Sequence, residues 1–273
     1  MKNSSAPVGV GRRRSNPLRA VLRLGFVLFL TLYLLALLMI RRWGRPKMAG
    51  REEALRLFRR WAEAICRRLG LEKTVRGPTP PVGSCLVPNH QSYLDILLLA
   101  SLAPAVFVAK AEIASWPGIG FLARTTEQVF LQRSRTRRML LSMGEIRERL
   151  QSGCRVCIFL EGTTSGGEGV RRFHPALLEP VLESGAPIVP IAIRWSSSDP
   201  AISVSEDIAY WKDHNFVRHL WRLFGLNGIR AQVVFGEPRS GADRDRIVLA
   251  KELHDAVQGM FEGLSSEFRV SSF

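Results

Sequence analysis

The chain has 273 residues, of which 46% are hydrophobic and 23% charged, proportions that are ordinary for a globular protein. These values exclude an intrinsically disordered chain, a collagen-like fibre and a small disulfide-stapled domain. The formal net charge of +15 indicates an anionic partner, either nucleic acid or a membrane surface. Residues 1–75 contain 17 Lys or Arg and 4 acidic residues, while the rest of the chain is nearly neutral. We therefore expect the basic N-terminus to contact membrane lipids, and we expect no nucleic-acid partner.

The most apolar segment of the chain, Leu24–Ile40, has 17 residues and no charge. As a helix it would be about 25 Å long, somewhat shorter than the roughly 30 Å hydrocarbon core of a bilayer. The sequence after it, Arg41-Arg42-Trp43, does not resemble a signal-peptide cleavage site, and arginines on both sides disfavour a buried core helix. We expect this helix to insert into the membrane. Because its basic flanks are balanced, its orientation stays open, and so does the choice between spanning the bilayer and entering one leaflet.

A second N-terminal helix is predicted over Arg51–Leu69, where apolar residues recur at helical spacing and Gly70 follows as a stop signal. Arginines fill much of the remaining surface, which is typical of a helix at an anionic membrane surface. A helix that packs on its own domain has the same pattern, and the two interpretations can hold at different ends. The basic aromatic segment Tyr210–Phe224 is a further candidate for membrane contact. We expect residues 1–75 to form a membrane-anchoring unit and residues 76–273 to form a separate domain.

The body of the chain alternates short apolar runs with helical patterns after a proline-rich joint at Thr74–Gly83. The expected strands are Ser84–Val87, Val106–Ala109, Val129–Leu131, Val156–Leu160, Ile188–Ile193 and Ile229–Phe235. The expected helices are Ser92–Leu102, Arg135–Ser152, His174–Glu183 and Asp243–Leu264. This alternation predicts an α/β fold, with a mixed, mostly parallel sheet flanked by helices and preceded by the membrane-inserting helical segment. In such sheets, ligands bind beyond the carboxyl ends of the strands.

The cysteines indicate a compartment rather than a site. Cys154 and Cys157 form a CxxC pair, but no second pair or histidine cluster completes a zinc site. We interpret both as small core residues, and we expect no metal. The sequence has no secreted disulfide framework, so the body is expected to face the reducing cytosol.

The first candidate site follows the first expected strand, in the sequence NHQSYLD at residues 89–95. Ser92 is a favourable N-cap and Asp95 a favourable first-turn acid, but this interpretation leaves His90 unexplained. A histidine at the carboxyl end of a strand lies where ligands bind, and an ionised Asp95 could hold its imidazole while His90 acts as general base. No glycine-framed serine elbow occurs nearby, so direct attack by a substrate hydroxyl is favoured over a covalent enzyme intermediate.

The second candidate site follows the expected strand Val156–Leu160, in the sequence EGTTSGG at residues 161–167. Consecutive small residues can turn backbone N–H groups toward an anion. The lysine and glycine spacing of a P-loop are absent, which disfavours a nucleoside triphosphate. A flexible loop is the simpler interpretation, but a carboxylate directly after an apolar strand favours a binding site.

Together these segments resemble sequence blocks of the glycerolipid acyltransferase family, of the lysophosphatidic acid acyltransferase type. The NHxSxxD pattern at residues 89–95 is similar to block I, and FxEGTxS at residues 159–165 is similar to block III. Val129–Arg133 resembles block II, an apolar strand that ends in arginine, and Ile188–Ile191 resembles block IV. The order and the spacing agree over residues 82–194.

The resemblance implies that His90 is the catalytic base and that Asp95 is its partner. It also implies a set of acceptor-binding residues: Arg133, Glu161, Gly162, Thr163, Thr164 and Ser165. The acyl donor would be a thioester of coenzyme A or of acyl carrier protein, with no further cofactor. His90 would deprotonate the attacking hydroxyl and later protonate the leaving thiolate.

The acceptor expected first is lysophosphatidic acid (1-acyl-sn-glycerol-3-phosphate), which acylation converts to phosphatidic acid. Thr164 departs from this expectation, because members that form phosphatidic acid usually carry arginine there, although Arg171 and Arg172 could compensate. Members that acylate lyso-ornithine lipid have threonine at this position, so that lipid is the alternative acceptor. A non-catalytic lipid-binding protein is the competing class, but binding alone needs neither His90 nor Asp95. The expected location is the inner (cytoplasmic) membrane, with the catalytic domain facing the cytoplasm.

Overall fold

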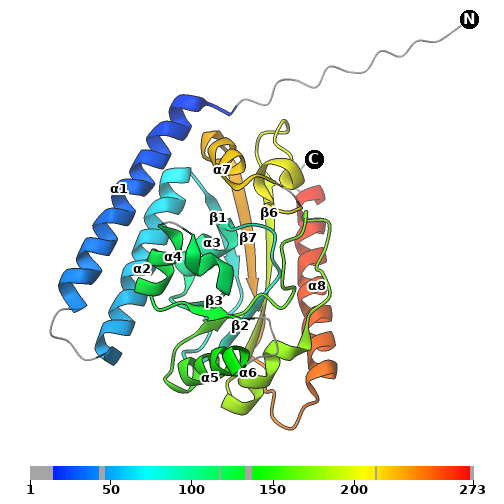
Figure 1. The fold of residues 1–273 in the computed structure, drawn as a ribbon. Coiled ribbons are helices and arrows are strands. Elements are labelled where there is room, and N and C mark those ends of the chain that lie inside the picture. The colour runs from blue at the N-terminus through cyan, green and yellow to red at the C-terminus, as the bar shows by residue number, and fades with distance from the viewer. Residues whose placement is uncertain (1–14, 43–46, 117, 133–136, 213, 271–273) are drawn as a thin grey trace, which may run out of the picture.

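A computed structural model describes residues 15–42, 47–116, 118–132, 137–212 and 214–270. These residues form a seven-stranded sheet with helices on both faces (Figure 1). The strands are β1 (Glu72–Arg76), β2 (Cys85–Pro88), β3 (Val106–Lys110), β4 (Val129–Leu131), β5 (Val156–Cys157), β6 (Ile188–Ser197) and β7 (Ile229–Phe235). Their order across the sheet is β1-β7-β6-β2-β5-β3-β4.

Neighbouring strands run parallel, except β6 and β7, which pair antiparallel. The predicted mixed, mostly parallel sheet is therefore confirmed. β2 lies between β5 and β6 and runs parallel to both. The segments that follow β2 and β5 consequently leave the sheet at the same edge, beside the later part of β6.

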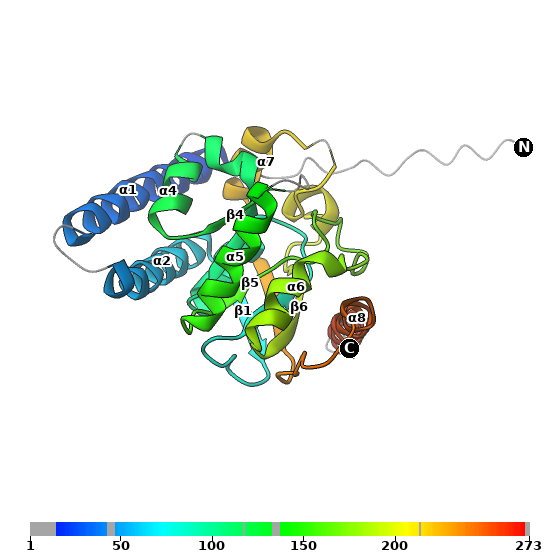
Figure 2. The same ribbon diagram turned by 60° about the horizontal axis from the view of Figure 1, so that its bottom comes forward.

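The helices are α1 (Pro17–Arg42), α2 (Lys47–Leu69), α3 (Leu94–Leu102), α4 (Ile119–Thr125), α5 (Arg137–Gln151), α6 (Glu179–Ser184), α7 (Phe216–Gly225) and α8 (Arg246–Val270). Short helical turns occupy Ala111–Ser115, Pro175–Leu178 and Val204–Ile208. Apolar residues of α2, α3 and α7 form one core with one face of the sheet, while α5, α6 and α8 cover the other face. Figure 2 shows α6 and α8 on the side away from α1 and α2.

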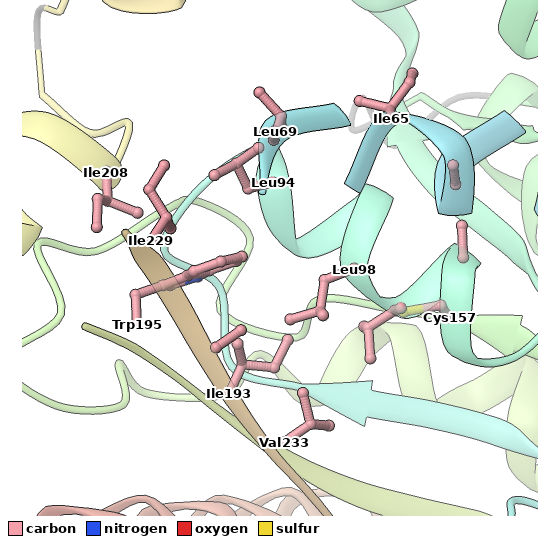
Figure 3. Close-up of a cluster of buried hydrophobic side chains, with 14 of the residues drawn as sticks. Ile65, Leu69, Leu94, Leu98, Cys157, Ile193, Trp195, Ile208, Ile229 and Val233 are labelled. Carbon is pink, nitrogen blue, oxygen red and sulfur yellow. The ribbon is translucent and has the colours of Figure 1, made fainter. Parts of the chain in front are cut away.

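The core under α2 and α3 joins the second N-terminal helix to the sheet (Figure 3). Ile65 and Leu69 of α2 pack with Leu94 and Leu98 of α3, and all are almost fully buried. Burying such a side chain contributes about 1.5–3 kcal/mol. The apolar face of α2 therefore packs on its own domain, whereas most of its arginines are exposed: Arg56, Arg59, Arg60, Arg67 and Arg68.

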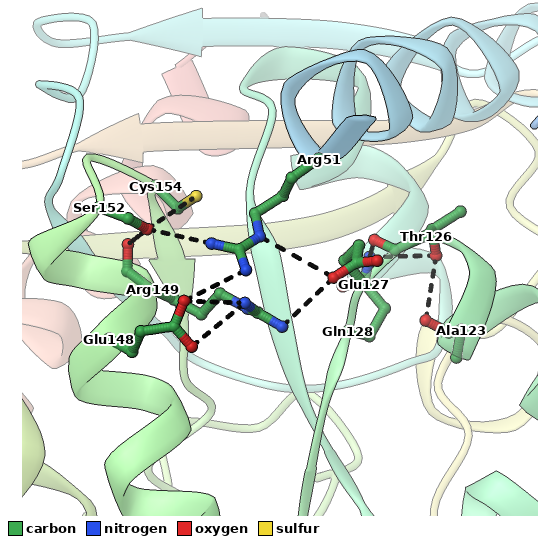
Figure 4. A network of polar contacts seen from close by, with 9 residues as sticks. All are labelled: Arg51, Ala123, Thr126, Glu127, Gln128, Glu148, Arg149, Ser152 and Cys154. Carbon is green, nitrogen blue, oxygen red and sulfur yellow. Dashed lines mark hydrogen bonds and ion pairs between the residues drawn. The ribbon is translucent and has the colours of Figure 1, made fainter. Parts of the chain in front are cut away.

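A network of charged side chains also ties α2 to the elements beside β4 (Figure 4). Arg51 of α2 donates to Glu148 Oε1 at 3.2 Å and lies 3.9 Å from Glu127 Oε2. Arg149 of α5, whose side chain is nearly buried, approaches the same two carboxylates at 3.4 Å. The network therefore links α2 and α5 to the turn that precedes β4.

β1 is absent from the elements expected from the sequence, because residues 72–76 fall within the expected anchor and joint. Its sequence, EKTVR, is mostly exposed and has no alternating apolar pattern to reveal it. It pairs in parallel with β7, from Glu72 opposite Arg230 to Arg76 opposite Val234. The expected boundary between residues 75 and 76 thus falls inside a strand. The division into an anchoring unit and a second domain stays a prediction about function.

Most other elements lie where the sequence predicts them. β4 and β7 have the expected bounds, β5 ends earlier than expected at Cys157, and β6 extends beyond Ile193 to Ser197. Beyond β5, the Ile158 N–H still donates to the Leu86 carbonyl of β2 at 2.9 Å, and the turn begins at Leu160. α4 and α7 are not among the predicted helices.

The first helix, α1, lies along the domain, with one side buried and the other exposed. Its buried residues are Ala20, Arg23, Leu34, Leu35 and Leu38. Exposed residues recur at helical spacing on the other side, with Gly25 and Ala36 between the large apolar ones: Leu18, Val21, Leu22, Leu28, Phe29, Leu32, Tyr33, Met39 and Ile40. By length and composition alone, Pro17–Arg41 is long and apolar enough to cross a membrane.

Candidate active site

The first candidate segment leaves the sheet at the carboxyl end of β2 and enters α3 at Leu94. Asn89 bonds both backbone groups of Ile193 on β6, donating to its carbonyl at 2.9 Å and accepting from its N–H at 2.7 Å. The Gln91 side-chain amide donates to the same carbonyl at 2.8 Å. These bonds fix the residues on either side of His90 to the neighbouring strand.

His90 and Asp95 form the expected pair. His90 Nδ1 lies 2.8 Å from Asp95 Oδ2, the aspartate is completely buried, and the histidine side chain is 15% exposed. Because a carboxylate only accepts hydrogen bonds, this contact places the proton on Nδ1 and leaves Nε2 as an acceptor. Within the described residues Nε2 has no hydrogen-bond partner. The imidazole stacks on Phe159, with 3.8 Å between ring centroids, so its orientation is fixed on a second side.

The Asp95 carboxylate has several further donors. Oδ2 also accepts the backbone N–H groups of Gln91 at 2.7 Å and Ser92 at 2.8 Å, and Oδ1 accepts Trp195 Nε1 at 2.7 Å. Such charge-assisted bonds offset the cost of burying an ionised carboxylate.

The expectation that Ser92 caps α3 is wrong. The N-cap is Tyr93, no side chain caps the helix, and the buried Ser92 hydroxyl has no partner in the described part of the chain. Asp95 Oδ2 instead accepts the Ser92 backbone N–H, so this residue is bonded through its backbone and not through its hydroxyl.

Glu161 joins the second candidate segment to the first. Its Oε1 accepts the backbone N–H of His90 at 2.7 Å, and its Oε2 accepts that of Arg171 at 3.1 Å. Burial raises the pKa of Glu161 to about 8, in spite of these two donors. The backbone N–H of Ser165 also donates to the His90 carbonyl at 2.9 Å. The loop after β5 is therefore bonded to both backbone groups of His90.

Two of the three glycines in the loop, Gly166 and Gly167, allow it to lie close to neighbouring side chains. A Cβ on Gly166 would lie 2.7 Å from the ring of Trp211. Gly167 has φ of 92°, a region that favours glycine, and a Cβ there would lie 2.9 Å from Gln91 Oε1. Larger residues at these positions would displace the loop from His90.

The remaining predicted acceptor-binding residues divide into two groups. Gly162, Thr163, Thr164 and Ser165 lie in this loop, with Thr163 exposed, Gly162 and Thr164 partly buried, and Ser165 buried. Arg133 lies outside the described residues. The structure therefore brings His90, Asp95, Glu161 and the loop together.

Sequence reasoning missed the side chains that support the pair, above all Trp195 and Phe159. A signal for Trp195 was present, because Ile191 and Ile193 alternate along β6 and the next residue on the same face is Trp195. Tyr93 was missed as well. Its hydroxyl lies 3.0 Å from His219 Nδ1, and burial lowers the pKa of His219 to about 4, which keeps this histidine neutral.

Comparisons with known proteins agree with this arrangement. A sequence model of the Acyltransferase family matches residues 73–194, which include both candidate segments. A lyso-ornithine lipid O-acyltransferase of Pseudomonas aeruginosa is 35% identical over 205 residues, which are 74% of this chain and 77% of that protein. A 1-acyl-sn-glycerol-3-phosphate acyltransferase of Neisseria gonorrhoeae is 28% identical over 193 residues, or 70% and 74% of the two chains.

A solved structure has the same fold. The crystal structure of the 1-acyl-sn-glycerophosphate acyltransferase PlsC from Thermotoga maritima aligns with a TM-score of 0.63 and 23% identity, covering 89% of this chain and 98% of its own. The family match and the 35% identity to the Pseudomonas protein establish the class independently of this likeness. The chain belongs to the acyltransferase family, and it is an enzyme that acylates lyso-lipids.

Proposed function

We propose that the protein transfers an acyl group from a thioester to the free hydroxyl of lyso-ornithine lipid, with His90 as general base. The observation that carries the mechanism is the pair itself. Nδ1 of His90 is held 2.8 Å from a completely buried carboxylate, so that Nε2 is the acceptor nitrogen at the end of β2.

In this mechanism, His90 Nε2 takes the proton of the acceptor hydroxyl as its oxygen attacks the thioester carbonyl carbon. Asp95 stabilises the resulting imidazolium, because it accepts the Nδ1 hydrogen throughout. When the tetrahedral intermediate collapses, the C–S bond breaks and the thiolate receives the proton from Nε2. The products are an ester and a free thiol, and His90 returns to its neutral form. A thioester of coenzyme A or of acyl carrier protein supplies this chemistry, and no further cofactor is needed.

The choice of acceptor rests on the loop after β5. The phosphate of lysophosphatidic acid carries up to two negative charges, and arginine binds such groups in a bidentate manner. Residues 161–167 contain no Lys or Arg, and Thr164 stands where family members that form phosphatidic acid usually have arginine. The head of lyso-ornithine lipid has one carboxylate and one ammonium group, so it needs no such cation.

The relatives support the same choice. The Pseudomonas protein named for lyso-ornithine lipid is 35% identical, whereas the Neisseria protein named for 1-acyl-sn-glycerol-3-phosphate is 28% identical.

Lysophosphatidic acid is the second candidate acceptor. It is favoured by Arg171 and Arg172, which are exposed a few residues after the loop, and the backbone of Arg171 is bonded to Glu161 beside His90.

The acceptor is tested by measuring transfer of a labelled acyl group to each lyso-lipid by purified protein in mixed micelles. We expect a higher kcat/KM for lyso-ornithine lipid. Thr164→Arg should shift the ratio toward lysophosphatidic acid by about tenfold, equivalent to about 1.4 kcal/mol, whereas the uncharged control Thr164→Val should not. A wild type that prefers lysophosphatidic acid, and loses that activity in Thr164→Arg, would contradict the acceptor but not the mechanism at His90.

We also propose that α1 lies within one leaflet of the inner (cytoplasmic) membrane, with the catalytic domain facing the cytoplasm. Its buried residues Leu34, Leu35 and Leu38 pack against α2, so a spanning orientation would carry the exposed arginines of α2 into hydrocarbon. Its exposed apolar face instead suits insertion to a shallow depth. Two helices that pack against α1 also have exposed apolar residues, Ile119 and Phe121 on α4 and Val217 and Trp221 on α7.

A further inference from the structure

We infer that Trp195 is a positioning residue for the reaction: its indole N–H fixes the Asp95 carboxylate, which in turn fixes His90. The inference rests on the proposed function, in which His90 is the general base. It concerns a residue on β6, outside both segments that the sequence singles out.

The indole of Trp195 contacts the Asp95 carboxylate directly. Trp195 lies opposite Ala231 of β7 and is 2% exposed, in the core between the sheet, α2 and α3 (Figure 3). Its Nε1 donates to Asp95 Oδ1 at 2.7 Å. Among the described residues it is the only donor to Oδ1, whereas His90, Gln91 and Ser92 all donate to Oδ2. The carboxylate is therefore held at both oxygens.

This two-sided arrangement determines which oxygen faces His90. Without the indole hydrogen, Oδ1 would be buried and unpartnered, a state that costs free energy. The carboxylate could then rotate to offer Oδ1 to the N–H groups of Gln91 or Ser92. Such a rotation would move Oδ2 away from His90 Nδ1, and small displacements of a catalytic group lower rates strongly.

Strand β6 thus holds the first candidate segment at two successive positions on one face. The backbone of Ile193 bonds the side chains of Asn89 and Gln91, and the side chain of Trp195 bonds Asp95. A buried indole N–H needs a hydrogen-bond acceptor, and any backbone carbonyl could provide one. The acceptor for Trp195 is instead the carboxylate of Asp95, which holds His90.

The test compares two tryptophan-to-phenylalanine variants of the full-length enzyme. Trp195→Phe removes the donor to Asp95. The control Trp61→Phe removes an indole bond of similar length, 3.0 Å to Thr31 Oγ1, between α2 and α1. We expect Trp195→Phe to lower kcat about tenfold, or about 1.4 kcal/mol, with little change in KM for either substrate. Trp61→Phe should keep the wild-type kcat.

A double variant separates positioning from general destabilisation. Adding Trp195→Phe to His90→Ala should cause no further loss of the residual rate, because the tryptophan acts through the histidine. If Trp195→Phe fails to fold, Trp195 is replaced by 3-benzothienylalanine, which keeps the ring size and substitutes sulfur for N–H. The same tenfold fall in kcat is then expected.

Two results would overturn the inference: an unchanged kcat in the folded Trp195 variant, or an equal further loss on top of His90→Ala. Neither result would contradict the proposed function if His90→Ala itself is nearly inactive. An active His90→Ala variant would instead refute the mechanism on which the inference rests.

Discussion

Replacing Arg23 by methionine removes a buried cation that holds α1 on the domain. Arg23 is 4% exposed and donates to backbone carbonyls at the C-terminal ends of two helices. At the end of α2 it bonds the carbonyls of Arg68 at 3.0 Å and Leu69 at 2.8 Å. At the end of α7 it bonds the carbonyl of Phe224 at 3.1 Å and that of Leu226, which follows the helix. Burial lowers the pKa of Arg23 to about 10, so the side chain stays charged at neutral pH. Its hydrogen bonds are therefore charge-assisted, and the positive charge interacts favourably with the negative C-terminal ends of both helix dipoles.

The expected loss of stability follows from these bonds. Hydrogen bonds of a charged group contribute about 1.5–3 kcal/mol each, but methionine also removes the cost of burying a charge, so we expect a net loss of about 3 kcal/mol. The assay is denaturant unfolding in detergent micelles, followed by tryptophan fluorescence. Arg19→Met is the matched control, since Arg19 lies one turn earlier and makes a single carbonyl bond of 3.3 Å to Gly225. If both variants lost the same small amount, Arg23 would not be what holds α1 in place.

Further predictions concern the loop, the pH dependence and the N-terminus. Burial raises the pKa of Glu161 from 4.5 to about 8, so folding favours the protonated form of this side chain. As the pH rises from about 4.5 to about 8, the free energy of unfolding of the wild type should therefore fall. The stability deficit of Glu161→Gln relative to wild type, measured as Tm, should therefore shrink between about pH 5 and about pH 8; a constant deficit would contradict this. Gly166→Ala should raise KM for the acceptor, because its Cβ would lie 2.7 Å from the Trp211 ring, and an unchanged KM would show that the loop tolerates the shift. Deleting residues 1–42 should leave a folded protein that sediments less completely with liposomes. Deleting residues 1–75 should abolish folding, because it removes most of β1 and the core residues of α2. Circular dichroism measures the folding of both fragments, and a folded 76–273 fragment would refute the prediction.

The parts of the fold that the sequence predicts are those with a local pattern. β4 and β7 alternate or bury apolar residues over their whole length, and α5 repeats apolar residues on one face, so their periodicity is visible without the structure. β1 is an exposed edge strand that exists because β7 pairs with it, which no local pattern records. The way α1 is held is also hidden, because the carbonyls that Arg23 binds are distant in sequence.

The candidate site divides in the same way. His90 and Asp95 are five residues apart and lie at a strand end, so their pairing could be inferred from spacing and topology. That Glu161 binds the acceptor stays a prediction, whereas its bonds to the backbone N–H groups of His90 and Arg171 are visible only in the structure. Trp195 was missed because it contacts Asp95 across 100 positions of sequence, through the packing of β6 beside β2.

The proposed mechanism requires His90 to act as the general base for acyl transfer to a lyso-lipid. Its most direct test is the rate of transfer from a labelled thioester to lyso-ornithine lipid and to lysophosphatidic acid by the wild type and His90→Ala. The exposed His174 provides the control His174→Ala, which removes an imidazole that the mechanism does not use. We predict that His90→Ala lowers the rate by about 10²–10⁴-fold with either acceptor, while it stays folded and His174→Ala keeps the wild-type rate. A folded His90→Ala enzyme with a near-normal rate would contradict the role of His90 as general base.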